Sequence, residues 1–209
     1  MGFWSIIKED FEQPKNQDPA FNSRVELFFN YPGVWAIVNY RFAHLLYEKN
    51  FKRLARIISG FSQIITGVDL HPEAKIGRRV FLDHANGIVI GQTTVIEDDV
   101  LIYQGVTLGA TSLERNIKRH PTIKSGVIIG SGAKILGDIT IGENAKIGSN
   151  AVVVKDVGAG LTAVGIPAYI VEHNKKKEKS RAIDELCENK LDKLESELLE
   201  LKKKIKKTK

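Results

Sequence analysis

The chain has 209 residues, a formal net charge of +6, 43% hydrophobic residues and a single cysteine. One cysteine excludes an intrachain disulfide and a zinc site built from several thiolates, and the length suits one domain with a small accessory element. No stretch offers the ~20 apolar residues of a membrane-spanning helix, and the N-terminus, MGFWSIIKEDFEQ, does not resemble a secretory signal. We therefore expect a cytoplasmic protein that does not bind membranes.

The positive charge is concentrated near the C-terminus. From Lys175 onward there are 13 Lys and Arg and 8 Asp and Glu, a net charge of +5 that leaves +1 for residues 1–174. A nearly neutral body does not predict a nucleic-acid partner, and alternating charges on a helical tail are typical of a solvated face.

Residues 1–66 are expected to be helical. From Val25 to Thr66, apolar residues recur at intervals of three and four, with a break near Pro32.

The next region, from about Leu70 to Ala168, has an aliphatic residue at every sixth position. Such a unit suits a short strand and a turn, and three units complete one triangular coil. The repeats therefore predict a mainly β protein with a left-handed parallel β-helix over residues 67–172, the hand being that of the known repeat class. The repeat positions are Leu70, Ile76 and Leu82, then Ile90, Ile96, Ile102 and Leu108, then Ile123, Ile129, Ile135, Ile141, Ile147 and Val153.

Two irregular intervals interrupt the period of six. The step from Leu82 to Ile90 is eight residues, an insertion of two just after Asp83 and His84. The step from Leu108 to Ile123 is fifteen and contains a polar loop, residues 109–122. Because residues inserted into a solenoid leave the stack as loops, we expect the wall to open beside His84 and the second loop to close over it.

The last segment, residues 175–209, has the spacing of about three heptads. It predicts a helix that either folds back on its own chain or, as we favour, joins a coiled coil at the end of a trimer. The seam residues are Cys187, Leu191, Leu194, Leu198, Leu201 and Ile205.

His84 is the first candidate for chemistry, although a lone histidine at a coil corner is more often structural. Asp69 lies fifteen residues earlier, slightly less than one coil, so the two can occupy successive layers near one corner. A carboxylate on one imidazole nitrogen fixes the tautomer and leaves the other nitrogen free to take a proton from a hydroxyl. This pairing favours a general base.

Arg119 and His120 form the second candidate group, with the alternative that they are merely a polar loop end. The planar guanidinium of Arg119 suits a carboxylate group of a substrate. No GxSxG elbow or Walker-type loop is present, so direct transfer between two bound substrates is favoured over a covalent intermediate.

Several motifs resemble the serine O-acetyltransferases of the hexapeptide-repeat acyltransferases. They are DLHPEAKIG, LDHANGIVIG, RHP and AVGIPA within Asp69–Ala168, and NQDPAFNS ahead of them. The resemblance implies transfer of an acetyl group from acetyl-CoA to the hydroxyl of L-serine, which gives O-acetylserine and CoA in the first step of cysteine biosynthesis.

The resemblance also implies roles for individual residues and no metal. His84 becomes the catalytic base, oriented by Asp69, while His120 is a second catalytic residue. Asp18 and Asp83 hold the ammonium group of serine, and Arg119 with His120 engages its carboxylate. Ala110 stands where the family usually has glycine, and the implied acetyl-CoA contacts are Gly109, Ala110, Ser131, Gly132, Ser149, Ala151 and Lys155.

The family further implies a homotrimer with active sites between prisms, and L-cysteine as feedback inhibitor. The short helical segment favours one trimer over a pair of trimers. The end KKIKKTK lacks a terminal isoleucine, which argues against docking to cysteine synthase.

Three alternatives stay open. The first is an acetyltransferase of a sugar or another small acceptor on the same fold, which does not need the amino-acid contacts around His84. The second is a zinc carbonic anhydrase using His71, His84 and His120. The third is a non-catalytic trimeric scaffold.

Overall fold

The computed structural model describes residues 2–171 together with Lys190, and the fold below is that of residues 2–171. The predicted coiled coil over residues 175–209 lies outside this range.

The helical segment forms four helices, α1 (Phe3–Gln17), α2 (Glu26–Phe29), α3 (Pro32–Glu48) and α4 (Lys52–Thr66). The break predicted near Pro32 is the start of α3, where proline occupies a first-turn position and its missing N–H costs no hydrogen bond. α4 ends at Gly67, whose φ of 70° is the left-handed conformation that glycine adopts without strain.

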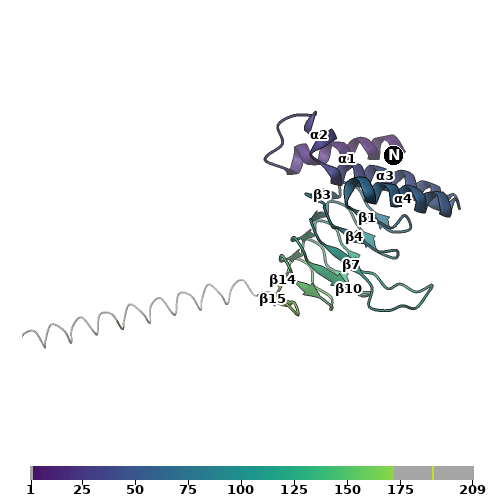
Figure 1. The fold of residues 1–209 in the computed structure, drawn as a ribbon. Helices are drawn as coiled ribbons and strands as arrows, with labels where there is room; N and C mark the ends of the chain where they lie inside the picture. Colours follow the sequence, from purple (N-terminus) through teal and green to yellow (C-terminus); the bar gives the residue numbers. More distant parts are fainter. Residues whose placement is uncertain (1, 172–189, 191–209) are drawn as a thin grey trace, which may run out of the picture. The chain divides into compact units, whose positions relative to one another are not determined.

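After Gly67 the chain winds into a three-sided parallel β-helix (Figure 1). Sheet A has the order β1-β4-β7-β10-β13, sheet B β2-β5-β8-β11, and sheet C β3-β6-β9-β12-β14-β15. All pairs are parallel except β14 with β15. The strands are β1 (Asp69–Leu70), β2 (Lys75–Ile76), β3 (Phe81–Asp83), β4 (Val89–Ile90), β5 (Val95–Ile96), β6 (Leu101–Tyr103), β7 (Thr107–Gly109), β8 (Thr122–Ile123), β9 (Ile128–Ile129), β10 (Lys134–Leu136), β11 (Thr140–Ile141), β12 (Lys146–Ile147), β13 (Val152–Val153), β14 (Thr162–Val164) and β15 (Tyr169–Val171).

The residues of the six-residue period fill the axis of the prism. In sheet A, Ile90, Leu108, Ile135 and Val153 are consecutive Cα partners and are at most 2% exposed. Each strand contributes one inward aliphatic side chain per coil, so stacking buries a continuous column. This confirms the fold predicted from the repeats.

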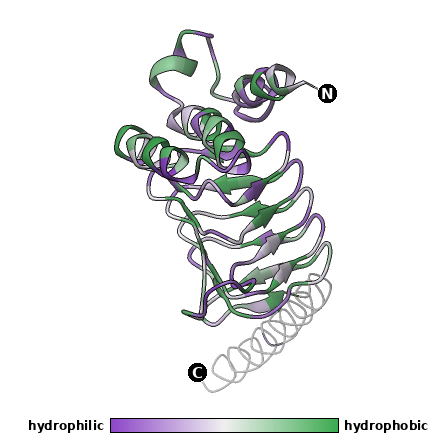
Figure 2. Cartoon of the chain, turned by 90° about the vertical axis from the view of Figure 1, so that its right-hand side faces the viewer, coloured by the Kyte–Doolittle hydropathy of each residue, from purple (hydrophilic) through white to green (hydrophobic). Residues whose placement is uncertain are grey.

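The helices cover the first coil of the prism (Figure 2). α4 packs against β1 in sheet A, while α1 and α3 pack against β3 in sheet C, and α3 packs against α4. Among the helices of residues 2–171, none is long and apolar enough to cross a membrane.

Two corners of the prism matter for the site. Corner C–A comprises the turns that lead from sheet C to sheet A, and corner A–B those from sheet A to sheet B. The inserted pair lies at corner C–A, where His84 and Ala85 have positive φ angles of 56° and 52°. Directly after His84, Ala85 is 0% exposed and Asn86 is exposed, so the expectation that the residues inserted here leave the stack is only half correct. The longer loop, between β7 and β8, leaves at corner A–B.

Candidate active site

The first group of candidate residues gathers at corner C–A. Asp83 ends β3, and His84 follows it with an exposed side chain. Asp18 directly follows α1, and its carboxylate accepts hydrogen bonds from the Tyr31 hydroxyl (2.6 Å) and the Ala20 N–H (2.8 Å). The loop between α1 and α3 thereby brings Asp18 to the corner that carries Asp83 and His84.

Electrostatics link the members of this group. The hydrogen bonds from Tyr31 and Ala20 lower the pKa of Asp18, and a charged His84 lowers it further. Burial raises the pKa of Asp83; the charge on Asp18 raises it too, whereas a charged His84 lowers it. The negative charges of two carboxylates beside one exposed imidazole favour the binding of a cation at this corner.

Asp69 lies one coil above this corner. It begins β1, and its N–H donates to the carbonyl of Ile88 at 2.9 Å, so the chain at Asp69 stacks on the turn that follows His84. Within residues 2–171, no hydrogen bond joins the side chains of Asp69 and His84. The orientation of His84 by Asp69 stays a prediction.

His120 lies at corner A–B and is 7% exposed. Its Nδ1 accepts the Thr93 N–H at 3.2 Å and lies 2.9 Å from Thr93 Oγ1. Burial lowers the pKa of His120, and the charges of Arg119 and Lys118 lower it further. The ring is thus held neutral, and because Nδ1 is an acceptor, Nε2 carries the proton.

Gly91 explains why the ring fits there. A Cβ atom at Gly91 would lie 2.0 Å from Cδ2 of His120, so any larger residue would displace the imidazole.

Arg119 belongs to a row of polar contacts at the same corner. Its guanidinium donates to Gln92 Oε1 at 3.1 Å, and Gln92 Nε2 donates to Glu73 Oε2 at 2.7 Å. The Tyr47 hydroxyl also donates to Glu73. A hollow of about 340 Å³ lies beside this row and is lined by Glu73, Gln92, Thr93, Ile117, Lys118 and Arg119 among others.

His71 supports this corner from the coil above. Its Nδ1 accepts the Glu73 N–H at 3.1 Å, and its ring packs against the ring of Tyr47 in a T-shaped arrangement. Burial and the charge of Arg56 lower the pKa of His71 to about 4, so the side chain is neutral at pH 7. Among the described residues, no group of three His, Cys, Asp or Glu side chains is arranged to hold a metal ion.

The residues implied in binding acetyl-CoA divide between the two corners. Ser131, Gly132, Ser149 and Ala151 follow strands of sheet C and lie along corner C–A in lower coils, where Ser131 Oγ donates to Ser149 Oγ at 3.2 Å. Gly109 ends β7 of sheet A, Ala110 and Lys155 follow strands of the same sheet, and all three lie towards corner A–B.

A glycine strip, made of Gly87, Gly105 and Gly132, runs down corner C–A. Gly87, Gly105 and Gly132 have φ angles of 74°, 70° and 71°, and each stacks on the next through backbone hydrogen bonds of neighbouring turns. A Cβ at Gly105 would lie 3.5 Å from the Cα of Gly132, so the backbone itself forms the surface here.

One chain therefore carries two half-sites, which flank sheet A. Corner C–A holds a candidate base and two carboxylates, and corner A–B holds a guanidinium and a neutral imidazole. Three residues of these half-sites were not predicted from the sequence, because their contacts join elements that no periodicity relates: Tyr31, Gln92 and Glu73.

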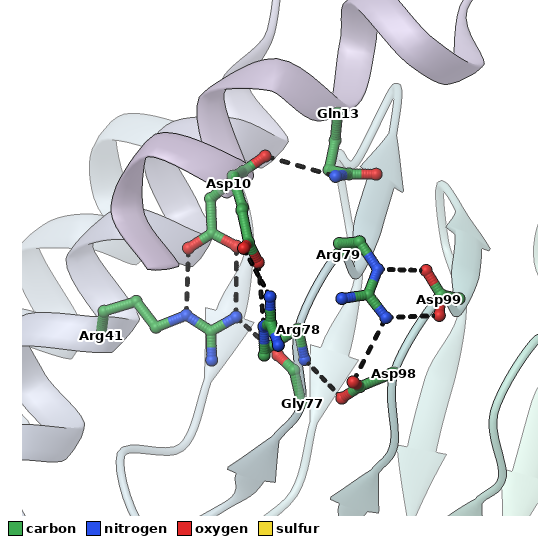
Figure 3. A network of polar contacts seen from close by, with 9 residues as sticks. Asp10, Gln13, Arg41, Gly77, Arg78, Arg79, Asp98 and Asp99 are labelled. Atoms are coloured by element: carbon green, nitrogen blue, oxygen red, sulfur yellow. Dashed lines mark hydrogen bonds and ion pairs between the residues drawn. The ribbon is translucent and has the colours of Figure 1, made fainter. Parts of the chain in front are cut away.

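Figure 3 shows how α1, which ends beside Asp18, is held on the prism. Arg41 of α3 donates to both carboxylate oxygens of Asp10 at 3.0 and 3.2 Å, and to the carbonyl of Gly77 at 2.6 Å. It also donates to the carbonyl of Ile76 at 2.6 Å. Asp10 is 2% exposed, so the pair is buried.

The fold and the repeats define a class of proteins. The family model described as bacterial transferase hexapeptide (six repeats) matches residues 120–155, so this part of the chain has the repeats of hexapeptide transferases.

Comparison with whole proteins is more specific. The chain is 45% identical to the serine acetyltransferase of Bacillus subtilis over 204 residues, which cover 96% of this chain and 94% of the relative. It resembles the soybean serine acetyltransferase complexed with serine (TM-score 0.77, 41% identity, 81% of this chain and 69% of that one). It also resembles a serine acetyltransferase in complex with cysteine (TM-score 0.78, 44% identity, 81% and 66%). The chain belongs to the serine acetyltransferases.

Proposed function

We propose that this chain transfers the acetyl group of acetyl-CoA to the hydroxyl of L-serine by direct attack, in the cytoplasm, as the first step of cysteine biosynthesis. The observation that carries the proposal is the pair of carboxylates, Asp18 and Asp83, beside the exposed imidazole of His84. A sugar hydroxyl has no cation for these carboxylates, whereas the ammonium group of an amino acid does.

In this mechanism His84 takes the proton of the serine hydroxyl as the oxygen bonds to the thioester carbonyl carbon. The carbon–sulfur bond then breaks, and CoA leaves with the proton. Asp69 orients His84, Asp18 and Asp83 hold the ammonium group, and Arg119 with the Nε2–H of His120 binds the carboxylate. Holding both substrates in line supplies much of the rate enhancement.

The two half-sites lie at different corners, which supports a site completed between subunits. We infer a homotrimer in which corner C–A of one chain meets corner A–B of the next. Acetyl-CoA then lies between two prisms, where the seven residues divided between the corners come together. L-Cysteine, which carries the same ammonium and carboxylate groups, competes with serine.

The test is CoA release from acetyl-CoA with L-serine, beside a panel of sugars. His84→Ala should lower kcat by the ~10² to 10⁴ expected for loss of a general base while the trimer persists. Release with a sugar but not with serine would contradict the proposal.

Mixing inactive variants tests the shared site. After subunit exchange between His84→Ala and His120→Ala trimers, about a quarter of randomly assembled sites regain both histidines. Recovered activity supports a site between subunits, and no recovery from confirmed mixed trimers would place both histidines in one chain's site.

A further inference from the structure

The outer face of α4 is a stripe of large apolar side chains in solvent. The helix buries its small residues, Ala55, Ser59, Ser62 and Thr66. The stripe consists of Leu54, Ile57, Phe61, Ile64 and Ile65, which are 47%, 55%, 62%, 80% and 77% exposed. Contiguous apolar patches of this kind mark interaction surfaces.

The position of α4 gives the direction of the stripe. The buried side of α4 packs on α3, which lies over β3 of sheet C, whereas α4 itself lies over β1 of sheet A. The outer face therefore points away from α3, on the sheet A side of the molecule. In Figure 2, hydrophobic residues (green) occur on the helices as well as on the strands of this unit.

The charges on α4 favour an apolar partner for its C-terminal half. Lys52, Arg53 and Arg56 lie in the first two turns, and the stretch from Ile57 to Thr66 contains no charged residue. The most exposed members of the stripe, Ile64 and Ile65, lie in this uncharged half, directly before β1.

The proposed shared site indicates which surface faces the stripe. The two half-sites flank sheet A, so a three-fold assembly that joins corner C–A of one chain to corner A–B of the next turns sheet A of every chain towards the axis. The outer face of α4 turns inwards with it.

We propose that the outer face of α4 packs against neighbouring copies of this chain near the three-fold axis. The helix thereby stabilises the subunit contacts that complete each active site. This inference rests on the proposed function, because the shared site sets the direction of sheet A.

The test is the variant Ile64→Asp, studied by sedimentation over a wide range of protein concentration. A charge placed in an apolar contact should raise the concentration at which trimers half-dissociate by about tenfold or more. Serine-dependent CoA release should fall in dilute solution and recover at high concentration. Gln63→Asp is the matched control, because it adds the same charge at a neighbouring exposed position and should change neither quantity.

The outcomes separate this inference from the function. If Ile64→Asp trimers half-dissociate at the same protein concentration as wild-type trimers, the inference is overturned, even if the wild type acetylates serine. A wild-type monomer that binds vesicles of phosphatidylglycerol and phosphatidylcholine would also overturn it, in favour of a lipid surface. If Ile64→Asp loses its helical circular dichroism, Ile64→Ser replaces it, with a smaller shift expected in the same direction. Failure of the wild type to use serine, with trimer dissociation still sensitive to residue 64, would refute the function alone.

Discussion

Replacing Arg41 with methionine tests how firmly α1 is fixed to the prism. The guanidinium makes four hydrogen bonds, two to the carboxylate of Asp10 and one each to the carbonyls of Ile76 and Gly77. Both are buried: 9% of the side-chain surface of Arg41 and 1% of that of Asp10 are exposed. Removing one member of a buried pair costs about 3–5 kcal/mol, because the other charge loses its partner.

The loss should depend on pH. Burial raises the pKa of Asp10 even though Arg41 opposes the shift. Without Arg41 the carboxyl of Asp10 is more easily protonated in the folded protein than in the unfolded chain. The folded variant then binds more protons than the unfolded chain, so its free energy of unfolding decreases as the pH rises, and the loss relative to wild type is larger at pH 8 than at pH 5.

Urea unfolding followed by tryptophan fluorescence, at fixed protein concentration, measures this loss. The KM for serine should rise as well, because α1 ends beside Asp18. Glu9→Gln is the comparison, because the Glu9–Arg78 pair also fixes α1 to the prism but its side chains are 23% and 35% exposed, so its removal should cost much less than Arg41→Met. Equal losses for Arg41→Met and Glu9→Gln would refute the reasoning.

Three further predictions concern the two half-sites. Tyr31→Phe removes a donor that lowers the pKa of Asp18, so the acid limb of kcat/KM for serine should move to higher pH and KM should rise about tenfold; unchanged pH profiles would contradict this. Gly91→Ala places a Cβ against the ring of His120 and should cost about 1–3 kcal/mol with loss of activity, and a variant as stable and active as wild type would show that the ring can move freely. His71 has a folded pKa of about 4, below that of the unfolded chain, so it contributes stability at pH 7 that is lost as the pH falls from about 6.5 to 4. In His71→Asn, the free energy of unfolding measured in urea should depend less on pH between pH 7 and 5. An unchanged pH dependence would show that other groups cause the loss of stability.

The period of six was enough to predict the prism because every coil repeats the same physical requirement. Each strand buries one aliphatic side chain, and a one-residue change of register would expose the whole column. The irregular steps located the turn at His84 and the loop that contains His120 for the same reason.

The contacts that assemble each half-site could not be predicted in this way. Asp18 and Tyr31 lie on either side of α2, and Arg41 of α3 binds Asp10 of α1. No repeat spacing in the sequence relates these partners. The pattern of α4 predicted a helix but not its orientation. Its small polar face is buried and its apolar face is exposed, which is the reverse of what periodicity alone favours in a single chain.

The glycine strip at corner C–A has a consequence for the evolution of the fold. Neighbouring parallel strands are about 4.8 Å apart, so the turn at Asn150, three coils below His84, is displaced by about 14 Å along the axis. The prism therefore sets distances along this corner in fixed increments. A duplicated or deleted coil of three repeats would change the length of an extended ligand that fits between the base and the lower turns, without altering the chemistry at either end.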